Sequence, residues 1–175
     1  MSPRQGTTLP HGMPQPIIRE YTQRIEAEPA VVFPLICPVR EAEWLEGWAE
    51  AFELIWSASG AAEPGCVFRT REVAVPETIW VIADHDPTCG RVRFVRVTEG
   101  LLATTLDIVV SDVGDGASSV QIRYTTVPTS GEGARFAANR FDPGAFSAEM
   151  AWWERSMNHY LRTGALLHRL QVAQR

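Results

Sequence analysis

Six segments between residues 51 and 128 have the pattern of short strands, and turns rich in Gly, Pro, Asp and Ser separate them. Most of these segments place apolar side chains on one face and charged or polar side chains on the other. In the fifth segment, for example, Leu102, Leu106 and Ile108 fall on one face. The segments are 51–57, 66–73, 78–83, 91–97, 102–111 and 119–128. A parallel sheet is buried on both sides, whereas an antiparallel sheet with one side in water has this alternation. We therefore expect an antiparallel sheet with a single apolar face.

A long amphipathic helix is expected after the strands, over residues 145–172. At 100° per residue its apolar side chains gather on one broad face, and arginines recur every seven residues on the opposite face. The apolar face is rich in thioethers and aromatic rings, which adapt to shapes other than their own. Its members are Phe146, Met150, Trp153, Met157, Tyr160, Leu161, Gly164 and Leu167. We expect this helix to cover the sheet and to enclose a cavity that binds an apolar molecule.

The remaining elements complete an α+β architecture. Residues 17–26 have the pattern of a further strand, and residues 30–36 and 40–48 that of two short helices. A run of strands followed by a helix is typical of α+β domains. We therefore expect a curved, seven-stranded antiparallel sheet with two short helices and one long C-terminal helix. Residues 17–175 would form this single domain, and residues 1–16 a flexible N-terminal tail.

Composition excludes several classes of function. With 16 basic and 21 acidic residues the formal net charge is −5, and no run of Arg or Lys matches a phosphate backbone, so no nucleic-acid partner is expected. Cys37, Cys66 and Cys89 stand far apart, without a Cys-x-x-Cys pair or a histidine at ligand spacing. We therefore expect no metal, no cofactor and a reducing compartment. The chain has no 18-residue apolar run, so no transmembrane helix and no stable membrane association are expected. The predicted location is the cytoplasm.

Two segments carry a family resemblance: residues 33–48, FPLICPVREAEWLEGW, and residues 153–164, WERSMNHYLRTG. They resemble the SRPBCC superfamily of START/Bet v 1-like helix-grip proteins, and in particular its uncharacterised bacterial single-domain members. The expected order of elements matches that superfamily over residues 17–173. The resemblance implies a deep apolar cavity between the C-terminal helix and the concave sheet. It carries over no catalytic residue, because the superfamily has no shared catalytic motif.

The predicted ligand-binding residues are those that the strand alternation and the helix pattern place inside. They are Trp56, Phe68, Phe94, Leu106, Tyr124, Thr126, Met150, Trp153, Met157 and Leu161. An ordinary hydrophobic core is the alternative interpretation of the same set. Tyr124 is its best polar member, because a hydroxyl among apolar neighbours must find a partner. That partner is either a ligand oxygen or a neighbour in the core.

Several other positions have more than one interpretation. Arg96 falls in phase with Phe94, and if buried it needs a partner such as Glu72 or a ligand carboxylate. The interpretation we favour is that Arg96 lies near the strand end and reaches solvent. His168 is the histidine that the helix pattern places on the inner face. Residues 131–146 are either a lid or a loop packed by its own aromatic side chains.

These observations favour a protein that binds a hydrophobic or aromatic small molecule between the helix and the sheet. No Ser/His/Asp, Cys/His or phosphate-loop pattern is present, so no catalytic residue is predicted. The resemblance leaves two alternatives open: an enzyme of the polyketide cyclase or aromatase kind, and a protein-interaction module like the Hsp90-activator relatives. Trp152, Leu166 and Leu170 fall near the arginine side of the helix, and this edge is a candidate contact surface for the N-terminal tail or for a second subunit of a homodimer.

Overall fold

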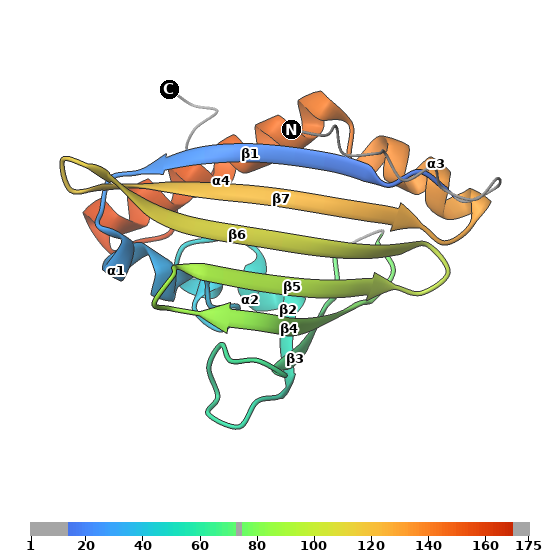
Figure 1. Cartoon of the computed structure of the whole chain (residues 1–175), viewed down its shortest axis with the longest axis horizontal. Coiled ribbons are helices and arrows are strands. Elements are labelled where there is room, and N and C mark those ends of the chain that lie inside the picture. Colours follow the sequence, from blue (N-terminus) through green and yellow to red (C-terminus); the bar gives the residue numbers. More distant parts are fainter. Residues whose placement is uncertain (1–13, 73–74, 170–175) are drawn as a thin grey trace, which may run out of the picture.

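The computed structural model describes residues 14–72 and 75–169, which contain one seven-stranded sheet with helices on one of its faces (Figure 1). The strands are β1 (Ile17–Ile25), β2 (Phe52–Trp56), β3 (Val67–Thr70), β4 (Thr78–Asp86), β5 (Arg91–Thr98), β6 (Leu102–Gly114) and β7 (Ala117–Pro128). Their order in the sheet is β1-β7-β6-β5-β4-β3-β2, and every neighbouring pair is antiparallel. The predicted α+β class and the seven-stranded antiparallel sheet are confirmed. The expected tail, residues 1–16, lies outside the described residues except for residues 14–16.

Four short helical turns replace the two short helices that the sequence predicted. They are α1 (Pro29–Val32), η1 (Phe33–Ile36), η2 (Glu41–Glu43) and α2 (Trp48–Ala51). Residues 40–48 do not form one helix: η2 ends before Trp44, which has a non-helical φ of −129°, and Gly47 adopts a left-handed conformation, with φ 82°, just before α2. Two indole N–H groups tie the second pair of turns to the first. Trp44 Nε1 donates to the carbonyl oxygen of Leu35 at 2.8 Å, and Trp48 Nε1 to that of Pro38 at 2.6 Å.

The long C-terminal helix is α4 (Pro143–Thr163), and it lies behind the β1 side of the sheet in Figure 1. Asp142 caps its start by accepting hydrogen bonds from the backbone N–H groups of Gly144 and Ala145, with Pro143 in the first turn. The predicted end at Val172 is wrong. The helix ends at Thr163 because Gly164, with φ 69°, forms a left-handed C-cap.

Hydrogen bonds from buried and edge positions fix α4 against β1. Gln23 Nε2 donates to the carbonyl oxygen of Met150 at 2.8 Å in the interior. At the edge, Asn158 Nδ2 donates to the carbonyl oxygen of Arg24 at 3.0 Å, and the Glu26 N–H donates to Asn158 Oδ1 at 2.8 Å. The predicted pairing of one long helix with the concave sheet face is therefore held by specific polar contacts as well as by apolar packing.

The connection between β7 and α4 contains a helix, α3 (Gly131–Arg140), where the sequence predicted a lid or an irregular loop. Ser130 caps it by accepting a hydrogen bond from the Gly133 N–H at 2.9 Å. Gly133 lies against the backbone of Leu101, so closely that a Cβ atom there would be 2.0 Å from the Leu101 carbonyl oxygen. This contact seats α3 at the end of the sheet and places the buried Phe141 directly after it.

Burial along the strands follows the predicted alternation except in β2, where Leu54 and Trp56 are both exposed. Residues 78–83, whose inward phase the sequence left open, place Trp80 and Ile82 inside. The predicted inward position of Trp56 is wrong, since 55% of its surface is exposed. The reason is that β2 is the edge strand of the sheet and its register with β3 shifts between Leu54 and Trp56.

The helix edge that was a candidate homodimer surface is also different from the prediction. Trp152 is buried, and the guanidinium carbons of Arg169 and Arg155 lie 4.6 Å and 5.7 Å from its ring. Leu166 is half-buried, and Leu170 lies outside the described residues. No helix in residues 14–72 or 75–169 is both long enough and apolar enough to cross a lipid bilayer.

Candidate ligand-binding site

Arg96 on β5 lies on the inner face of the sheet among aromatic rings. Its guanidinium carbon is 4.8 Å from the ring centre of Trp80, 5.3 Å from that of Tyr124 and 5.7 Å from that of Phe141. Burial lowers the pKa of Arg96 from its usual value. Within the described residues its side chain makes no hydrogen bond and no ion pair. The favoured prediction that Arg96 reaches solvent is correct only in part: the side chain is half-buried, because the rings of β4, β7 and the α3–α4 junction cover much of it.

Tyr124 is the second polar group of this cluster. It is buried, and its ring lies 5.8 Å from that of Phe141 and 5.5 Å from that of Phe146. Burial raises the pKa of Tyr124, and the nearby Arg96 charge acts in the opposite direction. The Tyr124 hydroxyl has no hydrogen-bond partner among the residues that the structure describes. Thr126 differs, since its hydroxyl lies 3.1 Å from that of Thr104, which satisfies it inside the core.

A surface groove of about 450 Å³ lies between the turns η2 and α2, the end of β3, and helices α3 and α4. Its walls are partly apolar, with Leu45, Trp48 and Trp153, and otherwise charged. The charged members are Glu46, Glu50, Arg71, Glu72, Arg140 and Glu149. Arg140 and Glu72 are also close enough to affect the pKa of Arg96. We infer that the Arg96 cluster lies next to this groove.

A much smaller cavity, of about 20 Å³, lies between α4 and the sheet. This volume accommodates about one water molecule. Its walls come from β1, β6, β7, η1, η2 and α4, and they are Gln23, Ile36, Glu41, Trp44, Ile108, Val120, Ile122, Trp153 and Met157. Trp153 lines both this cavity and the surface groove, so it lies between them. Trp153 Nε1 donates to Glu149 Oε1 at 3.2 Å, and its ring lies edge-on to Trp44 at 6.2 Å.

Glu41 is a site residue that the sequence analysis missed. Only 8% of its surface is exposed, and it lines the small cavity. Burial alone raises the pKa of Glu41 to about 8. The segment EAEWLEG has the composition of a solvated turn, which hid this residue. A signal was present in the spacing, because Glu41 precedes the large apolar Trp44 and Leu45 by three and four residues and shares their side of the turn.

Most of the predicted ligand-binding residues are buried in one connected cluster. Phe68, Phe94, Leu106, Tyr124, Thr126, Met150 and Met157 are buried, whereas Trp153 and Leu161 are partly buried against them. Phe68 stacks on Trp80 at 5.4 Å, next to Arg96, so the aromatic residues form one continuous wall. Ligand contact by these residues stays a prediction. Trp56 lies away from them, and His168 lies outside α4, where it is exposed and pairs with Glu46 at 2.9 Å.

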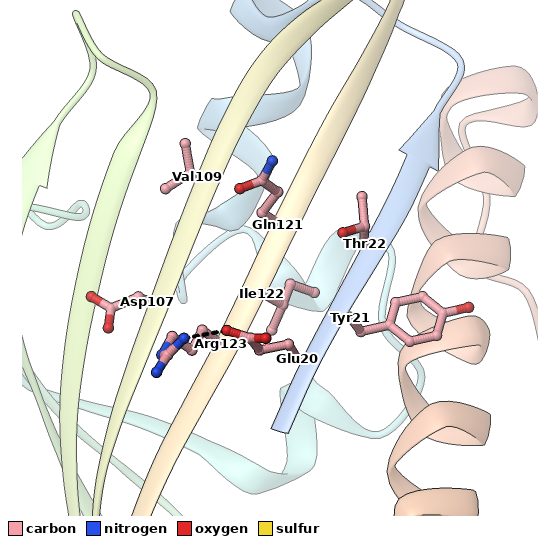
Figure 2. A pocket seen from close by; sticks show the side chains of 8 residues that line it. All are labelled: Glu20, Tyr21, Thr22, Asp107, Val109, Gln121, Ile122 and Arg123. Carbon is pink, nitrogen blue, oxygen red and sulfur yellow. Dashed lines mark hydrogen bonds and ion pairs between the residues drawn. The ribbon is translucent and has the colours of Figure 1, made fainter. Parts of the chain in front are cut away.

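Another groove, of about 380 Å³, lies on the solvent face of the sheet across β1, β7 and β6 (Figure 2). Its exposed residues are polar, and Arg123 and Glu20 form an ion pair across it. Tyr21 and Ile122 come from the same strands but point toward the helix side in this view. None of the predicted ligand-binding residues lines this groove. It offers an apolar molecule little to bind, and the inner face stays the candidate site.

No protein-family model and no curated protein matches this sequence. Solved structures match it over most of its length. Norcoclaurine synthase from Thalictrum flavum has a TM-score of 0.64 and 11% identity, with 93% of this chain and 96% of that chain covered. Zhui aromatase/cyclase from Streptomyces sp. R1128 has a TM-score of 0.59 and 11% identity, with 87% and 100% covered. DynU16, a protein in the dynemicin biosynthetic locus, has a TM-score of 0.59 and 14% identity over 85% of this chain, which spans only 48% of DynU16.

Identities this low show the fold alone. The chain has the START/Bet v 1-like helix-grip fold that residues 33–48 and 153–164 predicted, and the resemblance is confirmed at that level. The proteins that share this fold include a synthase whose structure was solved in complex with dopamine and hydroxybenzaldehyde, and an aromatase/cyclase.

Proposed function

We propose that this chain binds an aromatic or other apolar small molecule that carries an anionic group, and that Arg96 binds the anion. The observation that carries this proposal is the Arg96 guanidinium among three aromatic rings, without an ion-pair partner in the described residues. Glu72 is near enough to raise the pKa of Arg96 but forms no ion pair with it. A half-buried charge without a direct partner favours an incoming anion. A carboxylate or sulfonate on the ligand would supply the missing charge and accept hydrogen bonds from the guanidinium in a fork geometry.

The apolar part of the ligand would lie along the aromatic wall between the groove and the cluster. Trp48, Leu45 and Trp153 line the groove, and Trp80 and Phe141 surround Arg96. Burial of apolar ligand surface contributes roughly 25 cal/mol per Å² before ordering costs. The unpaired Tyr124 hydroxyl offers a second polar contact. Norcoclaurine synthase, which shares this fold, has been crystallised with dopamine and hydroxybenzaldehyde, both aromatic, and this supports an aromatic ligand at the level of the fold.

Two matched probes test this function. Anthracene-2-carboxylate and its neutral analogue 2-anthracenemethanol have the same ring system, and isothermal titration calorimetry measures the affinity of each. We expect the carboxylate to bind at least tenfold more tightly, because it alone supplies a counter-charge for Arg96. Equal affinities, or no binding of either probe, would contradict the proposal. Native mass spectrometry of freshly expressed protein then searches for a co-purified acidic aromatic compound.

A second candidate is an enzyme of the polyketide cyclase or aromatase kind. It is favoured by three ionisable side chains that burial removes from water near the inner face: Arg96, Tyr124 and Glu41. Acid–base catalysis needs such groups at shifted pKa values within reach of a substrate. Incubation with a synthetic poly-β-ketone thioester separates the two functions. A cyclised product formed at a rate that depends on Tyr124 would favour the enzyme, and tight binding without turnover would favour the binding protein.

A further inference from the structure

Glu41 is a buried residue of a small cavity whose other walls are mostly apolar side chains from several elements. Ile36 of η1, Ile108 of β6 and Met157 of α4 line the same small cavity. Gln23 of β1 also lines it, and its side-chain amide donates one hydrogen bond to the Met150 carbonyl oxygen. Within residues 14–72 and 75–169 the Glu41 carboxyl makes no hydrogen bond and no ion pair. A polar group in this position costs free energy unless something else that enters the cavity pairs with it.

The surroundings of Glu41 keep it protonated near neutral pH. The cavity walls from β1, η1, β6, β7 and α4 contribute no titratable side chain within the described residues. The neighbouring Glu43 on the same turn is ion-paired with Arg40 at 2.7 Å and accepts a hydrogen bond from Tyr160 of α4. Burial is the one cause that raises the pKa of Glu41 to about 8. A protonated carboxyl has one O–H group and therefore acts as a hydrogen-bond donor.

Glu41 and Arg96 both act electrostatically on Tyr124. The charge of Arg96 lowers the pKa of Tyr124, and that of Glu41 raises it. Tyr124 therefore lies within electrostatic range of both groups. Trp153, which is only partly buried, lines both the groove and the cavity of Glu41. If its indole ring moves, the water-sized cavity joins a groove of about 450 Å³.

Resting on the proposed function, we propose that Glu41 is a ligand-binding group that donates its carboxyl O–H to an uncharged carbonyl or quinone oxygen of the bound aromatic acid. The anion of the ligand lies at Arg96, and the carbonyl oxygen enters the cavity past Trp153. The preferred ligand class is then an aromatic acid that also carries a ketone or quinone oxygen.

The test compares anthraquinone-2-carboxylate with anthracene-2-carboxylate, which lacks the two carbonyl oxygens, by isothermal titration calorimetry. We expect wild type to prefer the quinone roughly tenfold, as one additional hydrogen bond in a dry site would give. Glu41→Leu should remove this preference while it still binds anthracene-2-carboxylate. Glu41→Gln keeps an N–H donor and should keep most of the preference. Glu43→Gln is the neighbour control and should leave the preference unchanged.

The pH dependence of binding to wild type is a second test, and it does not depend on whether a variant folds. Above pH 8 the wild-type carboxyl ionises and loses its donor, so the preference for the quinone should disappear by pH 9, whereas that of Glu41→Gln should persist. If the preference for the quinone survives both Glu41→Leu and high pH, the role of Glu41 is overturned but the proposed function is not. Binding of anthracene-2-carboxylate without any preference for the quinone would do the same. Failure of both probes to bind wild type would overturn the proposed function and this role together.

Discussion

The guanidinium carbon of Arg96 lies 4.8 Å from the ring centre of Trp80, and the two residues are direct partners across β4 and β5. Contact between a desolvated cation and an indole contributes about 2 kcal/mol. The penalty for removing a guanidinium from water is larger, several kcal/mol. The aromatic cluster therefore holds Arg96 in place without neutralising it. A charge held in this way favours the binding of an anion.

Arg96→Met should weaken the binding of anthracene-2-carboxylate at least tenfold and leave that of 2-anthracenemethanol nearly unchanged, because only the carboxylate needs the guanidinium. The unliganded variant should be as stable as wild type or up to about 3 kcal/mol more stable, since a half-buried unpaired charge is removed. Titration calorimetry and chemical denaturation measure the two effects.

Arg93→Met is the matched control for Arg96→Met. Arg93 is on the same strand but on the solvent face, where it pairs with Asp107 at 2.5 Å. Exposed pairs of this kind contribute about 0–1 kcal/mol, so both affinity and stability should hardly change. The contrary outcome is that Arg96→Met destabilises the protein, but the folded fraction still prefers anthracene-2-carboxylate over 2-anthracenemethanol. Arg96 would then be a structural residue, and the anion site would lie elsewhere.

Glu41→Gln should be more stable than wild type at neutral pH, and the difference should grow with pH. The pKa of Glu41 is raised from 4.5 to about 8 by burial. Between these values the unfolded chain has lost the proton and the folded chain keeps it, so wild-type stability falls as pH rises through this window. The slope is about 1.4 kcal/mol per pH unit for one such group. Urea denaturation at pH 5, 6, 7 and 8 measures it.

Glu41→Leu, which is also neutral, should show the same pH dependence as Glu41→Gln. Parallel curves for wild type and both variants across this range would mean that the Glu41 carboxyl is not held as a buried neutral acid. The proposed hydrogen-bond donor would then be lost as well.

Trp153→Ala should open the inner cavity to the groove. The variant removes the indole that lines both spaces, together with its hydrogen bond to Glu149 at 3.2 Å. We expect a loss of stability of about 2–4 kcal/mol and faster association of anthraquinone-2-carboxylate in stopped-flow measurements. Trp48→Ala is the control, because Trp48 lines the groove but not the cavity. It should weaken binding without increasing the association rate. An unchanged rate in Trp153→Ala would show that the ligand takes another path.

Met157→Trp should block the same cavity from the helix side. Met157 is buried, and the space beside it, about 20 Å³, is too small for the additional ring. Overpacking of this kind costs about 1–3 kcal/mol. Native mass spectrometry should show reduced retention of any co-purified compound, and calorimetry should show a lower affinity for the quinone probe. Unchanged retention would refute the placement of the ligand beside Met157.

The architecture could be predicted from the sequence because it depends on local periodicity. Leu106 and Tyr124 alternate with polar neighbours, and their strands pair as expected. Trp56 has the same local pattern, but whether an edge strand is covered depends on elements distant in the sequence. Gly164 marks the end of α4. The sequence analysis placed it on the apolar face of a longer helix instead, because the apolar pattern continues to Leu167. Helix α3 was missed because Gly131 and Gly133 lower helix propensity.

The polar groups of the site were harder to predict. The alternation placed Arg96 in phase with Phe94, but the depth at which it lies depends on Phe141, which α3 positions from far along the chain. Glu41 was missed because charged residues are almost never fully buried unless they are paired. Such exceptions are seen only when all the surrounding elements are in place.

Gly133→Ala should loosen α3 and so weaken ligand binding from a distance. A Cβ atom at this position would lie 2.0 Å from the Leu101 carbonyl oxygen, so the helix must move away from the sheet. We expect a loss of about 1–3 kcal/mol in denaturation and a weaker affinity for anthracene-2-carboxylate, because Phe141 at the end of α3 is one of the rings that hold Arg96. Gly131→Ala is the matched control: its Cβ would meet nothing within 4 Å, and the better helix propensity of alanine should leave stability unchanged or slightly raised. Equal effects of the two substitutions would mean that the contact with Leu101 does not hold α3 in place. A lower stability of Gly133→Ala without weaker binding would mean that α3 has no influence on the ligand-binding site.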